Sequence, residues 1–372
     1  MNDNTPIKVL EYGRLQDYDV NPSRIGFKWV TMESEKFICI CEKNRLLIID
    51  RSESNNLIQR PFKVDAAIMH PRSKIVALRD RRELQIYNLY LNYKVKTYIM
   101  HEDIVFWKWV NVKKLCVITE NSVYHWLLDG ISSPKKIFDR NLEMKNCDEI
   151  INYHVDAEEK WMLIVGVKVL NGNILGTIQL HKKETNKDNI IKGHAATFTS
   201  LKMEHGIYPT KFFIYSVRNQ DSSKLHIIEI DHKEENPVIA EKAVDVFYSS
   251  ENVNDFPISI QVSKKYYIIF LLTKNGYIQL FDLETGMCIY VSRVSPTTIF
   301  TSVPEEIDGG IVGVNRSGQI LSIDIDETNI VTYILDNLND RSLAIRLAKR
   351  NDLPGIEDIC SDDTDISGEI IL

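Results

Sequence analysis

The sequence predicts an all-β fold, a seven-bladed β-propeller followed by a short α-helical linker segment. Two observations lead to this prediction. A strand–turn–strand unit recurs seven times along the 372 residues, and successive units are spaced by roughly 35–55 residues, the range expected for four-stranded propeller blades. A radial array of blades also leaves no long sheet edge open to solvent, which suits a chain this rich in strands.

Each unit joins a largely apolar strand to a second, alternating strand through a polar turn. The units occupy residues 37–50, 74–89, 114–128, 161–180, 211–230, 266–286 and 309–325. The pattern is clearest in Tyr266–Gly286, where Asn275-Gly276 joins two apolar runs, because both residues of an Asn-Gly turn tolerate positive φ. Strands that are apolar on both faces are expected near the packed centre, and alternating strands nearer the rim.

A hairpin supplies half of a four-stranded blade, so other segments must supply the remaining strands. The stretches between the units, such as 60–71 and 241–263, are expected to do so and to cross from one blade to the next. Little β-like sequence follows the seventh unit. We therefore expect the N-terminal strand Ile7–Tyr12 to complete that blade and close the ring.

Helical sequence replaces the strand pattern near the C-terminus. Asn329–Leu335 is interpreted as a short connection, and Asp340–Arg350 as a helix with apolar residues at helical spacing and cations at its C-terminal end. Pro354-Gly355 interrupts this helix and leaves room for a short second one. The predicted organisation is a propeller over residues 1–330, the start of an α-helical linker over 331–359 and a disordered tail over 360–372.

Composition and charge argue against several functional classes. A net charge of −7 and a pI near 5.8 predict no global attraction to nucleic acid or to an anionic membrane. The N-terminus has no apolar signal region, and the apolar run Tyr266–Leu272 is far shorter than the roughly 20 residues that span a bilayer. We therefore expect a soluble intracellular protein.

The six cysteines include no Cys-x-x-Cys pair. Cys39 and Cys41 lie two residues apart on an apolar strand and so share one face of it. This arrangement favours two small core residues over a disulfide or a metal site. A reducing compartment fits this use of cysteine best.

The sequence holds none of the common motifs for catalysis, metal binding or phosphate binding, so we expect no enzyme activity, no cofactor and no metal. Two charged clusters remain, one of Asp324, Asp326 and Glu327, the other of Arg79, Arg81 and Arg82. The acidic cluster is interpreted as a solvated face rather than a metal or acid–base site, because no His or Cys lies nearby in sequence. The arginines are interpreted as a solvated turn, with a landing site for an acidic peptide as the alternative.

Several segments resemble the N-terminal domain of clathrin heavy chains, in family order and with family spacing from about residue 6 to 358. They are 21–40, 65–71, 106–109, 150–153, 224–230, 243–247, 254–258, 266–286 and 313–321. The family's domain is a seven-bladed propeller without enzyme activity, and the stretch after residue 335 resembles the start of its helical linker. The resemblance implies that the protein recruits endocytic adaptors by binding short peptide motifs in surface grooves.

The first implied groove, the clathrin-box site, lies between the first two blades and takes Leu-x-apolar-x-acidic peptides. The positions that match its lining are Ile58, Arg60, Phe62, Val76, Leu78, Gln85, Tyr87 and Lys94. Arg60 and Lys94 would meet the acidic side chains of an extended peptide. Glu83 and Asn92 stand where the family has threonine and lysine, so we expect weaker binding of strongly acidic motifs unless the nearby arginines compensate. Without the resemblance, Val76 and Tyr87 are typical of core packing.

Three further sites are implied by the resemblance. The positions that match the W-box site on the top face are Phe27, Glu149 and Ile151, and those that match a third groove, between blades four and five, are Trp161, Leu180 and Ile191. Glu149 replaces a glutamine, which should disfavour peptides with acidic flanks. Thr185 and Lys187 replace an arginine and an apolar residue of the third groove, and Glu11 matches a fourth proposed site.

The partners implied by the resemblance are endocytic adaptor and accessory proteins, met at the cytoplasmic face of coated pits and vesicles. Clathrin light chain and trimerisation are expected only if a longer chain exists. Nucleic acid is not an expected partner, and membrane is expected only indirectly, through adaptors. Two alternatives stay open: a scaffold paralogue that recruits no adaptors, and a propeller enzyme with a site at the central channel.

Overall fold

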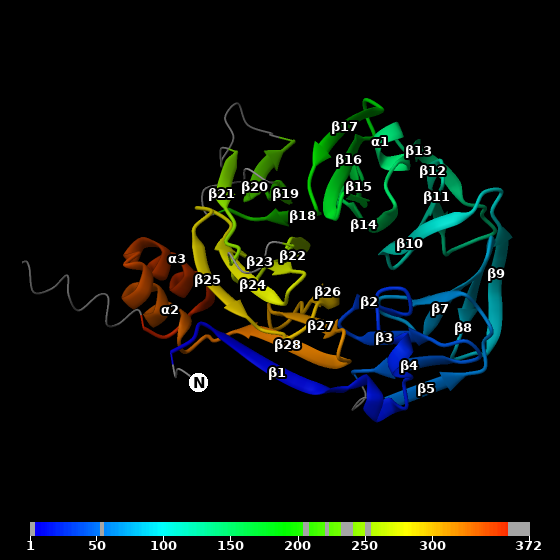
Figure 1. The fold of residues 1–372 in the computed structure, drawn as a ribbon, viewed down its shortest axis with the longest axis horizontal. Helices are drawn as coiled ribbons and strands as arrows, with labels where there is room; N and C mark the ends of the chain where they lie inside the picture. The colour runs from blue at the N-terminus through cyan, green and yellow to red at the C-terminus, as the bar shows by residue number, and fades with distance from the viewer. Residues whose placement is uncertain are drawn as a thin grey trace, which may run out of the picture.

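The computed structural model describes residues 4–52, 56–203, 208–219, 223–231, 241–249 and 254–355. Within these residues the strands form seven four-stranded sheets. The sheets stand around a central axis as the blades of a propeller (Figure 1). The seven-bladed fold that the repeats predict is therefore confirmed.

The first three blades follow one another along the chain. Blade one consists of β2 (Val30–Ser34), β3 (Phe37–Cys41), β4 (Leu46–Asp50) and β5 (Asn56–Arg60). Blade two consists of β6 (Ala66–Met69), β7 (Ile75–Asp80), β8 (Glu83–Asn88) and β9 (Tyr93–Ile99). Blade three consists of β10 (Ile104–Asn111), β11 (Lys114–Thr119), β12 (Ser122–Leu127) and β13 (Lys135–Asp139).

The next three blades repeat the same order of strands. Blade four consists of β14 (Glu149–Val155), β15 (Trp161–Leu170), β16 (Asn173–Lys182) and β17 (Lys187–Lys192). Blade five consists of β18 (Ala195–Leu201), β19 (Thr210–Arg218), β20 (Ser223–Ile230) and β21 (Lys242–Asp245). Blade six consists of β22 (Pro257–Ser263), β23 (Ile268–Thr273), β24 (Tyr277–Asp282) and β25 (Cys288–Arg293). Short helices η1 (Leu15–Tyr18), η2 (Pro22–Arg24) and α1 (Leu142–Lys145) lie in the connections.

The seventh blade joins the two ends of the propeller. It consists of β26 (Ile299–Pro304), β27 (Ile311–Asn315), β28 (Gln319–Ile325) and the N-terminal strand β1 (Ile7–Arg14), which pairs antiparallel with β28 along the outer edge (Figure 1). The pairing runs from Ile7 opposite Ile325 to Arg14 opposite Gln319. The expected closure of the ring by the N-terminal strand is confirmed.

The predicted hairpins are the two middle strands of each blade. Apolar clusters fill the spaces between consecutive blades. A middle strand such as β3 or β4 contributes side chains to the clusters on both faces of its blade. For this reason β4 is buried along its whole length. It is nevertheless the third strand of its blade, next to the outer strand β5, so it lies nearer the rim than β3, as expected for the second strand of a hairpin. The fourth strands, such as β5 and β9, form the exposed rim. In the turn before β24, Gly276 has a φ of +80°.

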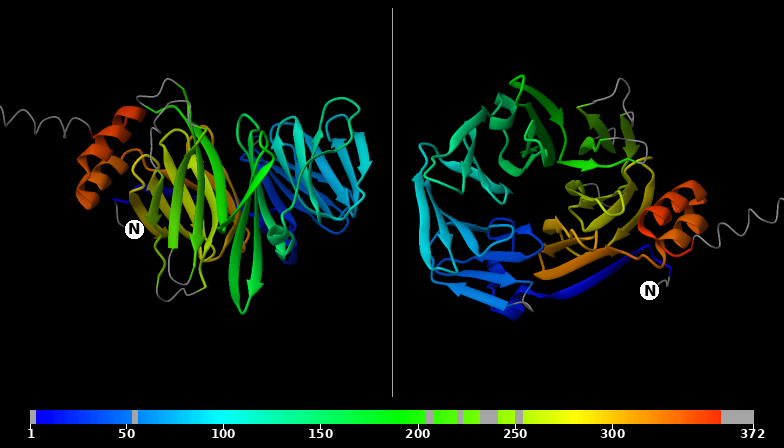
Figure 2. Two further views of the ribbon diagram at one scale, coloured as in Figure 1. Left: turned by 90° about the horizontal axis from the view of Figure 1, so that it is seen from above. Right: turned by 180° about the vertical axis from the view of Figure 1, so that it is seen from behind.

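A helical segment follows the last strand and covers the outside of blades six and seven (Figure 2). It consists of α2 (Ile330–Tyr333), the π-helical turn η3 (Ile334–Leu338) and α3 (Arg341–Asn351). The helix predicted over 340–350 forms, and the Asp340 side chain caps it by accepting from the backbone N–H of Leu343. The stretch 329–335 is helical rather than a connection, because its apolar residues pack on the same core.

The end of the sequence lies outside the described residues, so the expected second helix and the tail over 360–372 stay predictions. Among the cysteines that the structure describes, all five are free thiols, and Cys39 and Cys41 are buried core residues as expected. In the described part of the chain, no helix is long and apolar enough to cross a membrane.

Candidate functional site

The residues that match the first groove come together at the seam between blades one and two. Ile58, Phe62 and Tyr87 pack against one apolar cluster whose buried members include Val76 and Leu78. The ladders of blade two explain this convergence, because Val76 lies opposite Tyr87, Leu78 lies opposite Gln85, and Tyr87 lies opposite Lys94. Side chains at these opposed positions share one face of the sheet.

Burial divides these residues into a floor and a rim. Val76 and Leu78 are 0% and 1% exposed, so they have the burial of core residues and lie beneath the surface. The side chains of Ile58, Phe62, Gln85 and Tyr87 are partly exposed, and that of Lys94 is exposed. The rings of Phe62 and Tyr87 meet edge to face with centroids 5.0 Å apart. The apolar surface that a ligand could touch without rearrangement therefore belongs to the rim.

Arg60 spans the seam at the end of β5. Its Nη1 donates to the carbonyl oxygen of Gln59 at 3.0 Å, and its Nη2 to that of Leu89 in blade two at 3.4 Å. Its Nε is buried and has no hydrogen-bond partner among the described residues. The guanidinium is therefore held in place with unused donor capacity, which suits a carboxylate ligand.

Both substitutions in the groove contact a groove residue. Oε1 of Glu83 accepts a hydrogen bond from Nε2 of Gln85 at 2.8 Å, and Oδ1 of Asn92 accepts one from the Tyr87 hydroxyl at 2.8 Å. Glu83 adds a negative charge beside the amide of Gln85. Asn92 is neutral and supplies no charge to the groove. At the Tyr87 end of the groove, Lys94 lies opposite Tyr87 in the ladder and supplies a positive charge.

The three clustered arginines separate in the structure. Arg82 turns toward blade three and pairs with Asp103, with 2.5 Å between Nε and Oδ1. Arg79 is half-buried, and its Nη1 donates to the carbonyl oxygen of Ile104 at 3.1 Å. Arg81 has a φ of +54° at the tip of the turn, and its side chain is exposed. Arg82 therefore lies apart from the other two, whereas Arg79 and Arg81 both line one hollow beside the groove, so only part of the basic patch that the spacing indicates is formed.

The W-box positions lie on strands and turns at the centre of the ring. Phe27 is exposed in the turn that leads into β2, and Glu149 and Ile151 lie at the start of β14. Both strands are the innermost of their blades, and both face the central opening (Figure 1). Ile151 falls at an irregularity in the ladder between β14 and β15. Among the described residues, no hydrogen bond, ion pair or ring contact joins Phe27 to the other two.

The third set of residues gathers in the core between blades four and five. Trp161, Leu180 and Ile191 belong to or pack on one apolar cluster, and Leu180 is only 6% exposed. The ammonium group of Lys182 lies 4.8 Å from the centre of the Trp161 ring. Lys187, which replaces an apolar residue, lies opposite Lys182 in the ladder. One cation, Lys182, therefore stands beside the indole, and Lys187 lies on the next strand out.

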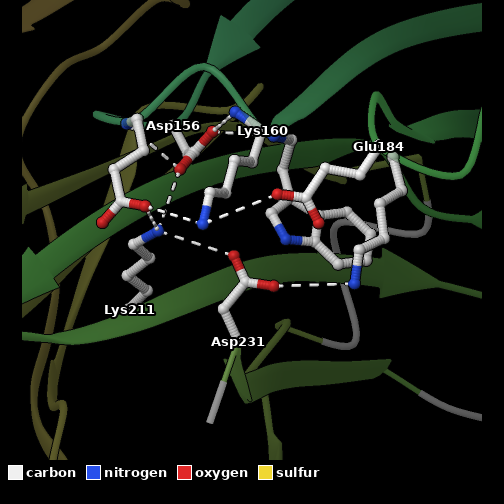
Figure 3. Close-up of polar contacts among 8 residues, drawn as sticks. Asp156, Lys160, Glu184, Lys211 and Asp231 are labelled. Carbon is white, nitrogen blue, oxygen red and sulfur yellow. Dashed lines mark hydrogen bonds and ion pairs between the residues drawn. The ribbon is translucent and has the colours of Figure 1, made fainter. Parts of the chain in front are cut away.

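An ion-pair network borders the Trp161 end of this cluster (Figure 3). Nζ of Lys211 lies 2.9 Å from Glu158, 3.4 Å from Asp156 and 3.5 Å from Asp231. Hydrogen bonds from Lys211 and Lys160 lower the pKa of the Glu158 carboxyl to about 2. Oδ1 of Asp156 also accepts from the backbone N–H of Trp161 at 2.7 Å. The network thus links blade four to blade five next to the indole.

Glu11, the fourth implied site, is exposed on β1. Its Oε1 lies 2.6 Å from Nε of Arg14, and its Oε2 accepts from Nε2 of Gln319 at 2.5 Å. These hydrogen bonds hold the pKa of the Glu11 carboxyl below its ordinary value. The acidic residues near the end of β28 are also paired, since Asp326 lies 3.0 Å from Lys8 and Glu327 lies 2.8 Å from Lys265. Two of the three acidic residues are therefore ion-paired, and the third, Asp324, is half-buried and accepts a hydrogen bond from the Ser322 hydroxyl at 2.7 Å, so the cluster is not a freely solvated face.

Three inner strands bring together a polar cluster that no pattern in the sequence indicates. Oε2 of Glu33 on β2 accepts from the backbone N–H of Trp109 at 2.9 Å, and Nζ of Lys108 on β10 donates to Asn152 on β14 at 2.9 Å. Burial raises the pKa of Glu33 to about 7, although Lys108 opposes the shift. Burial also lowers the pKa of His154, whose Nε2 has no partner among the described residues. These residues are far apart in sequence, so no motif could reveal them.

The described residues include no group of three or more His, Cys, Asp or Glu side chains that could hold a metal ion. The polar cluster of the inner strands supplies a carboxyl, an ammonium and an imidazole, but these groups contact backbone and amide atoms rather than one another. The arrangement is that of polar groups buried between blades, of which the Glu33 and Lys108 side chains are hydrogen-bonded and Nε2 of His154 has no partner among the described residues.

Comparisons with known proteins agree with this architecture. Residues 327–350 match the family described as clathrin, heavy-chain linker. The sequence is 44% identical to the clathrin heavy chain of Drosophila melanogaster over 359 residues, which cover 95% of this chain and 21% of that protein. It is 42% identical over 357 residues to clathrin heavy chain 2 of Homo sapiens, with 95% and 22% covered. It is 36% identical over 358 residues to a probable clathrin heavy chain of Schizosaccharomyces pombe, with 95% and 21% covered.

A likeness to a solved structure concerns the fold alone. A chain in the crystal structure of the mitotic checkpoint complex superposes with a TM-score of 0.57 at 10% identity, over 87% of this chain and 96% of that one. The present chain spans about a fifth of the length of the clathrin heavy chains that it matches. By sequence and by fold, it therefore belongs with the N-terminal region of the clathrin heavy chains, a seven-bladed propeller that leads into the heavy-chain linker.

Proposed function

We propose that the propeller binds short linear peptides of endocytic adaptor and accessory proteins in the groove between its first two blades. The observation that supports this best is the composition of the seam. The partly exposed side chains of Ile58, Phe62 and Tyr87 form an apolar rim above a buried floor. Arg60 and Lys94 flank this rim.

This composition suits an extended peptide with alternating apolar side chains and an acidic end. Side chains of an extended segment alternate in direction, so every second one can enter the apolar rim between the blades. Carboxylates of the peptide can then pair with Arg60, which has unused donor capacity, and with the exposed Lys94. Because exposed ion pairs contribute little, each single motif binds modestly, and repeated motifs gain affinity through avidity on a coat.

The protein would act at the cytoplasmic face of coated pits and vesicles and would reach the membrane through its adaptors. Binding of clathrin light chain and trimerisation belong to a longer chain. The W-box positions, the cluster around Trp161 and the region of Glu11 are secondary candidates for peptide binding. Lys182, whose ammonium group lies beside the Trp161 ring, favours acidic over apolar ligands there.

A second candidate function is that of a scaffold that recruits no adaptors. It is favoured by Glu83 and Asn92, which make the groove less positive than the family resemblance implies. The two functions differ in one measurable property, the binding of an acidic clathrin-box peptide.

Fluorescence polarisation with a labelled Leu-Leu-Asp-Leu-Asp peptide tests the proposal. Tyr87→Ala and Gln85→Ala are expected to weaken binding at least about tenfold, because each removes a contact at the rim. Phe247→Ala is the matched control, since Phe247 is an exposed aromatic residue after β21, remote from the seam. Unchanged binding in both groove variants would show that the peptide does not bind in this groove. No binding by the wild type would favour the scaffold function.

A further inference from the structure

A basic hollow of about 830 Å³ lies where the turns of the first two blades meet, next to the groove. Six cationic side chains line it: Arg24, Lys28, Lys43, Lys63, Arg79 and Arg81. Three carboxylates line it as well, those of Glu42, Asp65 and Asp80. The lining thus has three more positive than negative charges, in a protein whose net charge is −7.

The positive charge of the hollow is poorly compensated. Lys28, Lys43, Lys63 and the Arg81 side chain form no ion pair among the described residues. The Glu42 carboxylate is instead engaged by Arg45, which lies outside the lining, with 2.6 Å between Oε2 and Nε. Oδ2 of Asp65 accepts from the backbone N–H of Arg81 at 2.8 Å, which leaves the Arg81 guanidinium available.

Two half-buried arginines, Arg24 and Arg79, and the Trp29 indole belong to the lining of the hollow. Arg79 donates to the carbonyl oxygen of Ile104, but its Nε is buried without a partner among the described residues. The guanidinium of Arg24 and the ammonium of Lys28 lie 5.1 Å and 5.8 Å from the centre of the Trp29 ring. The cations are therefore held by packing and are free to donate hydrogen bonds to an anion.

This arrangement fits a phosphate monoester better than a carboxylate. A phosphate group carries up to two negative charges and three strong acceptor oxygens, so it can use several convergent donors at once. Guanidinium groups match its geometry, and ammonium groups add charge around it. A hollow of this size takes one such group with its neighbouring residues, whereas the net charge of the protein disfavours a long polyanion.

The position of the hollow indicates where the phosphate comes from. Lys63 and Val64 line the hollow directly after Phe62 of the groove, and Val64 packs on the same apolar cluster as the groove rim. Arg79 follows Leu78 of the groove floor on β7, but its side chain lies on the other face of the strand, against β10 of blade three. A peptide extended along the seam advances about 3.3 Å per residue, so within a few residues of its apolar motif it reaches the cations.

We propose that this hollow binds a phosphorylated serine or threonine located a few residues from the apolar motif of a peptide held in the groove. The proposal rests on the proposed peptide-binding function and names a class of ligand for it. Phosphorylation of an adaptor next to its motif would then strengthen its recruitment by this protein.

Four labelled peptides test the proposal by fluorescence polarisation with the wild-type chain. They carry the Leu-Leu-Asp-Leu-Asp motif with serine, phosphoserine or glutamate in the flank, or a scrambled motif with phosphoserine. The spacer to the motif is varied over about two to six residues on either side, to cover the reach of an extended chain. We expect the phosphoserine peptide to bind at least about tenfold more tightly than the serine peptide at the best spacer, and more tightly than the glutamate peptide.

Variants of the hollow test where the phosphate is bound. Lys63→Gln combined with Arg81→Asn is expected to abolish the gain from phosphorylation and to leave binding of the serine peptide unchanged. Asparagine tolerates the positive φ of position 81. Arg82→Gln is the matched control, because Arg82 lies in the same turn but pairs with Asp103. The gain from phosphorylation should survive in this control.

The outcomes separate this proposal from the peptide-binding function itself. Equal affinity of the serine and phosphoserine peptides at every spacer overturns the phosphate site and leaves the groove intact. Failure of every motif peptide to bind overturns the peptide-binding function. Tight binding of the scrambled phosphopeptide, or of vesicles with phosphorylated inositol lipids through the same two residues, also overturns the proposal, because the hollow would then act without the groove.

Discussion

The hydroxyl of Tyr87 donates a hydrogen bond to the side-chain oxygen of Asn92 at 2.8 Å. This bond joins β8 to the turn before β9 and fixes the Tyr87 ring, whose edge-to-face partner is Phe62. Asn92 has a φ of +53°, a conformation that asparagine tolerates better than most residues. Asn92, which stands where the family has a lysine, therefore also holds the rim in place.

Restoring the positive charge of the groove should strengthen the binding of acidic peptides. The variant Glu83→Thr, which leaves the bond between Tyr87 and Asn92 intact, is expected to bind the Leu-Leu-Asp-Leu-Asp peptide about two- to fivefold more tightly, because removing one exposed like charge contributes about 0.2–1 kcal/mol. Polarisation at low and high salt measures the gain, which should shrink as salt screens it. A variant of the peptide with asparagine in place of both aspartates is the control, and an equal gain for both peptides would contradict the electrostatic explanation.

The charge of Glu149 should disfavour acidic flanks at the W-box positions. Glu149→Gln removes an exposed carboxylate at the start of β14 and is expected to tighten binding of an acid-flanked W-box peptide about two- to fivefold. Isothermal titration calorimetry with acid-flanked and neutral-flanked versions of one peptide measures the difference. Equal affinities of the wild type and the variant for the acid-flanked peptide would argue against a role for this charge.

Burial of Glu33 should make the stability of the propeller depend on pH. The pKa of Glu33 is raised from 4.5 to about 7, so the folded state binds a proton more strongly than the unfolded state. The stabilisation is therefore complete below pH 4.5 and is lost as the pH rises toward 7. Because the side chain is only partly buried, we expect a loss of about 1–3 kcal/mol rather than the full shift.

The comparison of the wild type with Glu33→Gln isolates this contribution. The free energy of unfolding from urea titrations at several pH values should fall over this range in the wild type and fall less in the variant. Parallel curves for the two proteins would show that Glu33 has an ordinary pKa.

The linker helix should depend on one buried leucine for its attachment to the propeller. Leu347 on α3 is 2% exposed in the core shared with blades six and seven, so Leu347→Ala is expected to cost about 2–5 kcal/mol. Hydrogen exchange should become faster in α3, while the ladders of blades one to four keep their protection. Lys349→Ala on the exposed face of the helix is the control. Unchanged exchange in the Leu347 variant would show that α3 is held by its ion pairs, such as Arg346 with Asp282.

Much of the fold follows from local pattern in the sequence. Asn275-Gly276 between two apolar runs specifies a hairpin, and seven such units specify seven blades. The strand Ile7–Tyr12 follows from the missing fourth strand of the last blade, and the cap Asp340 with apolar residues at helical spacing specifies α3. These features depend on residues close together in sequence, or on counting the strands that a closed ring needs.

The tertiary structure decided what each side chain is exposed to. Neighbouring blades cover both faces of a middle strand, so the alternation of residues along Leu84–Tyr87 does not predict which side chains are exposed. Tyr87 is partly exposed, whereas Val76, opposite it in the ladder, is buried. The meeting of Glu33, Lys108 and His154 depends on three inner strands more than 40 residues apart. Local periodicity therefore determined the strands and their turns, whereas burial, charge pairing and the composition of the groove were decided by which blades stand side by side.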